Sequence, residues 1–306
     1  MLSRVAERVY WLARYLERTE DTARLILVRH NAILDLPRAL QPDWEMLLEV
    51  LGTRENFRGA ANEKNIIGFA FGERANPSSI ISSLSAAREN MRTTREVLPS
   101  EAWERANSLY LSVARRAGKG LPRPSRHSTL NNIIESCQQI TGMLSGTMNH
   151  DEAYQFIRMG RFVERADMIS RIIDTGSADL MAAGEEARPY QNVMWGSMLQ
   201  SLSAYQMYRL SVGTNVEGPA VLEFLMRSRE FPRAIGYCLD EIEHSMKRLP
   251  RGKETVEVVQ AVQRRVRRVR YAELEGEPLH DFLDDLQLRM QGVQNAVTTN
   301  WFSPGQ

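Results

Sequence analysis

Two segments of the chain carry the same arrangement of charged residues. Residues 14–24 read RYLERTEDTAR and residues 161–171 read RFVERADMISR, so the arginines, the aromatic residue, the Glu-Arg pair and an acid keep their places. A carboxylate beside guanidinium groups could serve as a general base, or the guanidinium groups could bind an anionic or amide ligand. The candidate residues for this chemistry are Arg14, Glu17, Arg18, Arg161, Glu164 and Arg165.

Each of these segments is predicted to be a helix that is covered on two faces. Apolar residues recur three and four positions apart, and residues 14–24 and 161–171 contain no glycine or proline. In the first segment, one side has the ordinary core pattern, and the other side combines small residues with Glu17 and Arg24. Because charges are rarely buried unless they are paired, each Glu-Arg pair is expected to lie in a partly buried ion network.

Two interpretations of this network remain open. If two halves of the chain pack about a pseudo-twofold axis, Glu17 could meet Arg165 while Glu164 meets Arg18, as in an isologous contact. Alternatively, the arginines could face a polar pocket and bind a ligand. Structural ion pairs are common, which favours the first interpretation, although charges in an unusual environment also raise the odds of a site.

The composition limits the class of protein. The chain has 306 residues, of which 43% are hydrophobic, and its formal net charge is +1. A real core is therefore expected, without a global attraction to nucleic acid or to an anionic membrane. Two cysteines, Cys137 and Cys238, are too few for a disulfide scaffold or a structural zinc site, and both are expected to be free and buried. Since the N-terminus lacks an apolar signal core and no run of 18 apolar residues occurs, a soluble cytoplasmic protein without a membrane partner is expected.

The elements that must position the Glu-Arg pairs are predicted to be helices throughout. No segment alternates strictly enough to predict a strand. A first helix should run from Ser3 toward Leu36, where Pro37 stops it. Further helices are predicted to start near Pro77, with this proline in the first turn, and near Ser128 after a linker over residues 118–124. The fold class is therefore all-α, a bundle of about twelve helices.

The order of landmarks repeats along the chain. Five matches in order, anchored by the Glu-Arg segments, favour duplication of a unit of about 150 residues. One half would span residues 1–148 and the other residues 149–306, packed together as one unit. The matched landmarks are Trp44 with Trp195, Phe69 with Phe224, Pro77 with Pro232, Pro99 with Pro250 and Leu130 with Leu279.

The search for common catalytic and metal-binding motifs in the sequence identifies no convincing site. The chain contains no GxxxxGK[ST] loop, no GxSxG elbow and no CxxC pair. Glu-x-x-His occurs at Glu241/His244 and Glu277/His280, a spacing used by di-iron bundles, but Pro278 suggests that Glu277 lies at a helix start. Ligand spacing alone is weak evidence. No metal, no other cofactor and no catalytic residue is therefore assigned.

The most basic stretch is residues 264–270, which could bind RNA, DNA or an acidic partner. Val266 and Val269 continue an apolar seam, and no aromatic residues interleave for base stacking. A solvated, ion-paired helix face is favoured, and no nucleic-acid partner is expected.

A second polar cluster occurs in the first half only. Arginines fall on one side of the helix over residues 80–98, and polar residues at its start could present an anion site, whereas residues 243–247 do not keep these charges. One-sided charge hints at a site, although a charged outer face is the favoured interpretation. The cluster consists of Asn76, Ser78, Ser79, Arg88, Glu89 and Arg92.

Four pieces of the chain together resemble the bacterial alpha-E family: residues 14–18, 76–80, 87–92 and 160–167. The resemblance covers nearly the whole chain and implies an all-helical fold in which Glu17, Arg18, Glu164 and Arg165 are the Glu-Arg positions. It also implies an accessory role beside a circularly permuted ATP-grasp protein and a transglutaminase-like peptidase, in a system that makes or cuts peptide-type amide bonds. It implies no reaction for this chain.

Two functions follow as hypotheses. The first is a non-catalytic helical protein that binds the ATP-grasp protein or holds the peptide that it modifies. The alternative is an enzyme or ligand-binding protein that acts on a peptide-like substrate, with Glu17 or Glu164 as general base and an arginine as electrophilic stabiliser. A pocket with unpaired arginines beside the Glu-Arg pairs would favour the alternative, and fully reciprocated pairs without a cavity would favour the first. The oligomeric state is not predicted.

Overall fold

The computed structural model describes residues 1–35, 43–182, 184 and 189–303. Within these ranges the chain forms thirteen α-helices, a few short 3-10 and π-helical turns, and no strand. The prediction of an all-α fold is therefore confirmed, with one helix more than the approximate count. No helix in this part of the chain is long and apolar enough to cross a lipid bilayer.

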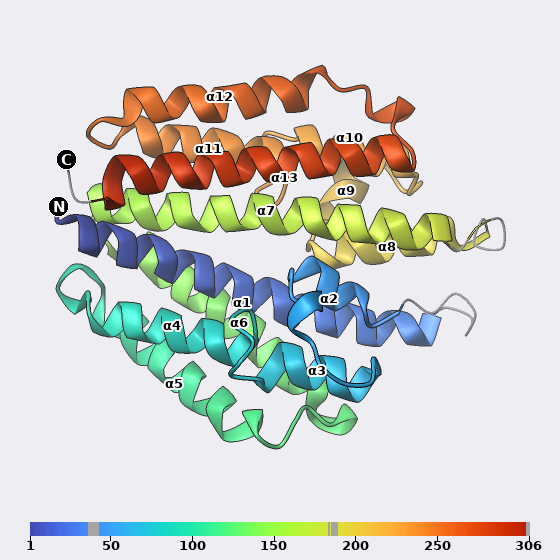
Figure 1. Cartoon of the computed structure of the whole chain (residues 1–306), viewed down its shortest axis with the longest axis horizontal. Coiled ribbons are helices and arrows are strands. Elements are labelled where there is room, and N and C mark those ends of the chain that lie inside the picture. Colours follow the sequence, from blue (N-terminus) through green and yellow to red (C-terminus); the bar gives the residue numbers. More distant parts are fainter. Residues whose placement is uncertain (36–42, 183, 185–188, 304–306) are drawn as a thin grey trace.

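Two long helices form the centre of the bundle. α1 (Ser3–Asp35) and α7 (Glu152–Ala182) lie side by side and run in the same direction, with both N-termini at the left of Figure 1. Gly160 allows their close approach, because a Cβ at this position would lie 2.3 Å from the carbonyl oxygen of Tyr10. The parallel arrangement places the two Glu-Arg segments at the same level of the bundle.

The remaining helices cover the central pair from opposite sides (Figure 1). α4 and α6 pack against α1 with α5 outside them, and α11 and α13 pack against α7 with α12 outside them. This shared packing order is what a duplication would produce, but the duplication and the two halves stay predictions. The helices of the first group are α2 (Met46–Val50), α3 (Glu63–Gly72), α4 (Ile80–Arg92), α5 (Ser100–Ala117) and α6 (Arg123–Thr147). Those of the second group are α8 (Gln191–Ser201), α9 (Tyr205–Ser211), α10 (Gly218–Arg227), α11 (Ile235–Lys247), α12 (Gly252–Arg268) and α13 (Glu277–Val297).

Several predicted boundaries need correction. α4 begins after Pro77, because the Ser79 side chain accepts a hydrogen bond from the backbone N–H of Ser82 and thereby caps the helix. α6 begins at Arg123 instead of Ser128, because Pro124 fits the first turn of a helix, so the linker before it is shorter than predicted. α1 continues to Asp35, and the predicted stop at Leu36 and Pro37 lies outside the described residues.

Candidate functional site

The two Glu-Arg pairs exchange partners across the central helices. Glu17 on α1 accepts hydrogen bonds from Nε and Nη2 of Arg165 at 2.5 and 3.0 Å. Glu164 on α7 accepts bonds from Nε and Nη2 of Arg18 at 2.5 and 3.1 Å. Glu17 is 3% exposed and Glu164 is 1% exposed. The predicted reciprocal pairing is therefore confirmed, and the ion network is more deeply buried than expected.

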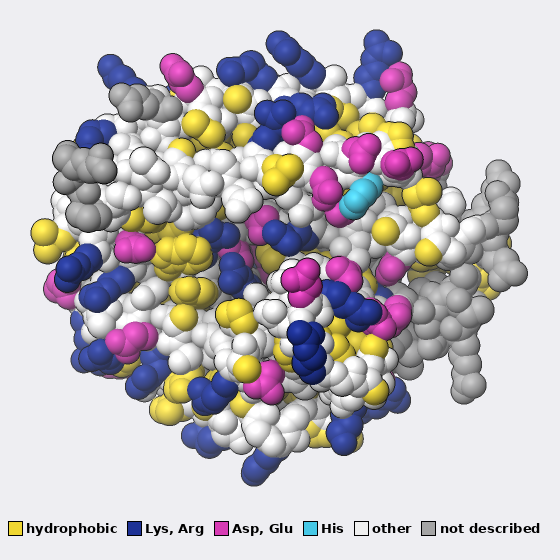
Figure 2. Space-filling view, viewed as in Figure 1, with side chains coloured by type: hydrophobic (Ala, Val, Ile, Leu, Met, Phe, Trp, Pro, Cys, Tyr) yellow, Lys and Arg dark blue, Asp and Glu magenta, His cyan; other side chains and the backbone are white. Residues whose placement is uncertain are grey.

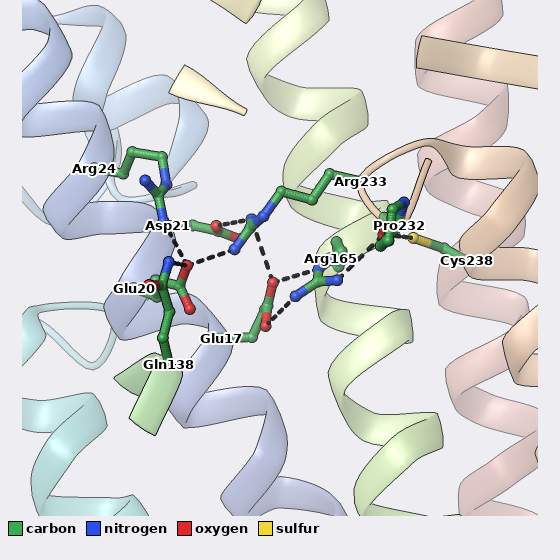
Figure 3. Close-up of polar contacts among 9 residues, drawn as sticks. All are labelled: Glu17, Glu20, Asp21, Arg24, Gln138, Arg165, Pro232, Arg233 and Cys238. Atoms are coloured by element: carbon green, nitrogen blue, oxygen red, sulfur yellow. Dashed lines mark hydrogen bonds and ion pairs between the residues drawn. The ribbon is translucent and has the colours of Figure 1, made fainter. Parts of the chain in front are cut away.

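Around Glu17 the structure forms a buried ion cluster, here called the inner cluster and defined as Glu17, Glu20, Asp21, Arg165 and Arg233 (Figure 3). Arg233, which precedes α11, donates hydrogen bonds to Asp21 at 2.7 Å and to Glu20 at 2.6 Å and lies 3.4 Å from Glu17. Arg165 also donates to the carbonyl oxygen of Pro232. Each of the five side chains is less than one-tenth exposed. The inner cluster therefore joins α1, α7 and the segment before α11, and it has no open face to a ligand.

The ionisation of the inner cluster is set by competition between burial and the arginines. Burial raises the pKa of Glu17, but Arg165 and Arg233 outweigh this effect and lower it to about 2. Burial dominates at Asp21 and raises its pKa to about 7 against the opposing effect of Arg233. Burial also raises the pKa of the Cys238 thiol to about 12, which leaves it protonated and a poor nucleophile. Both cysteines are free and buried, as predicted.

On the other side of the central pair, Glu164 lies beside an open cleft of about 480 Å³, here called the outer cleft, between α1, α7 and α13. Figure 2 shows arginine and acidic side chains gathered at the centre of this face, between the two groups of helices. Arg14 and Arg18 line the cleft from α1, and Asp167 and Arg171 line it from α7. The cleft therefore offers charges of both signs to a ligand.

The two arginines of α1 are held in place from behind. Arg14 donates to Glu164 at 2.6 Å and to the Oε1 atom of Gln294 at 2.7 Å, and its guanidinium carbon lies 4.8 Å from the Trp11 ring centroid. Arg18 bonds Glu164 and lies 5.9 Å from the Tyr15 ring centroid. Burial raises the pKa of Glu164, but Arg14 and Arg18 outweigh this effect, so the net shift of the pKa is downward. Glu164 thus stays ionised and orients both guanidinium groups at the cleft.

The wall opposite the arginines was not predicted. Gln287, Gln291 and Gln294 line the outer cleft from α13, together with the side chain of Leu288, which is 68% exposed. The glutamines are four and three residues apart, which places them on one side of the helix. This spacing was readable in the sequence as a polar row on a helix with an apolar stripe, but nothing in it indicated that the row faces Arg14.

The remaining arginine of the two Glu-Arg segments, Arg161, does not line the outer cleft. Arg161 occupies the place of Arg14 in the second segment, yet it does not pair with Glu17 as Arg14 pairs with Glu164. Its guanidinium carbon lies 4.7 Å from the Phe162 ring centroid, and within the described ranges its Nε has no hydrogen-bond partner. Arg161 lines a much smaller cavity, of about 20 Å³, between α1, α6 and α7, so among the described residues it forms no counterpart as large as the outer cleft.

The second polar cluster is not part of the outer cleft. Arg88 donates to Asn107 of α5 at 2.7 Å, and Arg92 pairs with Glu89 on the exposed face of α4. At the helix start, Asn76 accepts a bond from the backbone N–H of Ser78, and the Ser79 cap satisfies the first turn. Asn76 also donates to the carbonyl oxygen of Phe69 on α3, and Asn76 and Ser79 are buried, so these two residues form a structural turn before α4.

One group of potential metal ligands occurs at the rim of the outer cleft. Atoms of Asp174, His280 and Asp284 lie within 4.8 Å of one another. His280 already bonds Asp174 at 2.8 Å and is largely exposed, and Glu241 of the other Glu-x-x-His motif pairs with Arg158. Both arrangements are those of ordinary surface ion pairs.

The basic stretch 264–270 is engaged with acidic neighbours. Arg265 pairs with Asp285 at 2.9 Å, Arg267 lies 3.6 Å from Asp240, and Arg270 pairs with Glu273. The predicted ion-paired helix face is confirmed at Arg265 and Arg267, whereas Arg270 lies past the end of α12 at Arg268.

Comparison with known proteins identifies a matching family model and distant relatives. The family model Alpha-E, described as a predicted alpha-helical domain with a conserved ER motif, matches residues 1–302. An uncharacterized protein of Mycobacterium bovis and one of Mycobacterium tuberculosis are each 22% identical over 272 residues. The match covers 81% of this chain and 30% of each relative, so the chain spans about three-tenths of the relatives' length. No solved structure matches the chain.

Proposed function

The chain belongs to the alpha-E family, and from this premise we propose that it is a non-catalytic accessory protein whose outer cleft holds a peptide-like segment. The segment belongs to an ATP-grasp protein or to the peptide that this enzyme modifies, and a transglutaminase-like peptidase serves the same system. The work takes place in the cytoplasm, where ATP is available to the ligase.

The observation that carries the proposal is the pair of guanidinium groups that Glu164 holds at an open cleft. Arg14 and Arg18 are oriented before any ligand arrives, which lowers the entropy cost of binding. Carboxylates can pair with such arginines, and the amide groups of Gln287 and Gln291 can exchange hydrogen bonds with a peptide backbone. Leu288 provides apolar contact at the rim.

The length of the relatives supports work beside another protein. In the mycobacterial relatives the similar region is less than a third of a longer chain, so further parts of the same polypeptide accompany it.

The alternative of an enzyme that uses Glu17 or Glu164 as general base is less favoured. Arginine neighbours lower the pKa of both carboxylates, to about 2 for Glu17, which makes them weak bases near neutral pH. Among the described residues that line the outer cleft, there is no serine, threonine or cysteine to act as nucleophile.

Size-exclusion chromatography with an ATP-grasp protein from the same organism tests the proposal. We expect the wild-type chain to co-elute with it, and Leu288→Glu to abolish co-elution by placing a charge at the rim of the outer cleft. The matched control is Leu111→Glu on α5, where the leucine is 45% exposed and lies outside the cleft. Failure of the wild type to co-elute contradicts the partnership, and equal behaviour of the two variants contradicts the role of the cleft.

A further inference from the structure

A second cavity lies between α1, α2, α7 and α8, apart from the outer cleft. Its volume is about 60 Å³, and its wall is mostly apolar, with Trp44, Ile172 and Met198 among the residues that line it. Two charged side chains also line it, Arg29 from α1 and Asp179 from α7. An apolar cavity with one or two polar groups is the usual form of a small-molecule site.

Arg29 is buried in this wall without adequate partners. It is 7% exposed, its Nη1 lies 3.1 Å from the sulfur of Met46, and its Nη2 lies 3.6 Å from Asp179, beyond hydrogen-bond distance. Among the residues that the structure describes, Nε and Nη2 of Arg29 have no hydrogen-bond partner. A buried guanidinium with unpaired N–H groups costs free energy of folding. A ligand that accepts hydrogen bonds from these groups would therefore stabilise the folded protein.

The charges of the two side chains show the same imbalance. Burial lowers the pKa of Arg29 to about 10, and burial raises the pKa of Asp179. Both shifts go in the direction that disfavours charge, whereas the inner cluster holds Glu17 firmly ionised. The Arg29–Asp179 contact therefore does not compensate for its burial.

We propose that this cavity binds a small apolar monocarboxylate, with the carboxylate accepting hydrogen bonds from Arg29 and the alkyl group packing against Met198 and Ile172. A guanidinium suits a carboxylate because its parallel N–H groups match the two oxygens. The cavity volume of about 60 Å³ exceeds the roughly 10–15 Å³ that a single water molecule needs in the same measure, so there is room for a carboxylate with a short alkyl group. This site is independent of the outer cleft and of the proposed accessory role.

Sodium isobutyrate is the probe, and isobutyramide is its uncharged control of the same shape. Saturation-transfer NMR on the full chain should show binding of isobutyrate with a Kd on the order of 1 mM, typical of so small a ligand, and at least tenfold weaker binding of the amide. At ten times the Kd, isobutyrate should raise the Tm by about 2 °C relative to sodium chloride at equal ionic strength.

Three variants locate the effect. Arg29→Met removes the donors, and Ala32→Leu fills the cavity while keeping Arg29, so both should abolish isobutyrate binding. Arg171→Gln, at a residue that lines the outer cleft and does not line this cavity, should leave isobutyrate binding unchanged. If Arg29→Met does not fold, the loss or retention of isobutyrate binding in Ala32→Leu alone tests whether the ligand occupies the cavity.

Three results would overturn the proposal. They are equal binding of acid and amide, binding that survives Ala32→Leu, and no binding of isobutyrate by the wild type at ten times the expected Kd.

Discussion

At the scale of single residues, Glu17 and Glu164 occupy matching places in the two repeated segments but have different surroundings. Glu17 is enclosed by Arg165 and Arg233 within the inner cluster. Glu164 binds Arg14 and Arg18, whose other faces line the outer cleft. The same residue type therefore serves two roles: it joins helices in one segment and orients binding groups in the other.

The inner cluster makes Glu17→Gln strongly destabilising. The change leaves Arg165 and Arg233 buried with a lost charge partner, and breaking a buried pair costs about 3–5 kcal/mol. Urea unfolding should show this decrease in the free energy of unfolding. Glu89→Gln, which breaks an exposed and solvent-screened pair with Arg92, should cost far less, and equal losses would contradict the role of the inner cluster.

Asp21 should make stability depend on pH near neutrality. Burial raises its pKa from 3.8 to about 7, so between these values the folded state holds a proton that the unfolded state has released. Its contribution to stability is full below the unfolded pKa and is lost as the pH rises through 7. In Asp21→Asn the side chain cannot ionise, so this decrease in stability with rising pH should disappear.

Urea unfolding of both proteins at two pH values measures the effect. Between about pH 5.5 and pH 8, the free energy of unfolding of Asp21→Asn should gain about 2 kcal/mol relative to wild type. A difference between the two proteins that stays constant with pH would show that Asp21 does not titrate in this range.

At the scale of elements, the contact between α1 and α7 places the two Glu-Arg segments at one level. Parallel neighbours with a close approach at Gly160 bring residues 14–18 beside residues 161–165. α13 then completes the outer cleft on one side, and the segment with Arg233 closes the inner cluster on the other. The difference between the two Glu-Arg sites therefore arises from what packs over the central helices.

Gly160→Ala should force the central helices apart. The added Cβ would lie 2.3 Å from the carbonyl oxygen of Tyr10, a backbone atom that cannot turn aside, and overpacking of this kind costs about 1–3 kcal/mol. The matched control is Gly142→Ala in α6, where no atom lies within 4 Å of the new Cβ. That change should stabilise by about 0.5–1 kcal/mol through helix propensity, so thermal unfolding should show opposite signs. Equal signs would contradict the close approach.

At the scale of the whole molecule, the two groups of helices share their most buried charges. Glu17 on α1 depends on Arg165 and Arg233, and Glu164 on α7 depends on Arg14 and Arg18, so each central helix, with the group that covers it, holds a carboxylate that the other side neutralises. Unpaired buried charge is incompatible with a stable core. The groups are therefore expected to fold as one cooperative unit.

Calorimetry of the full chain should show one unfolding transition, with a van't Hoff enthalpy equal to the calorimetric enthalpy. Residues 1–148 and 149–306, expressed separately, should fail to fold alone, because each exposes buried ions and the apolar face of a central helix. Two separated transitions, or a stable isolated half, would contradict this expectation.

Part of the architecture could be predicted from the amino-acid sequence alone. Helical periodicity indicated α1 closely, because the apolar stripe of a helix is a local property of the sequence. Boundaries set by capping were less accurate, as at Ser79 and Arg123, because a polar or proline residue near a helix start can lie inside or outside it.

The sequence by itself determined the all-helical class and indicated that the charges of the two Glu-Arg segments are paired, whereas the structure decided that Glu17 pairs with Arg165 and Glu164 with Arg18. Small residues beside charges on a covered helix face leave few alternatives to mutual pairing, because buried charges need partners. Only the tertiary structure decided that Arg233 closes one site, that the glutamines of α13 face Arg14, and that Arg29 lines a cavity. These contacts join residues that lie far apart in the chain, so they depend on the packing angle and depth of each helix, which no local pattern specifies.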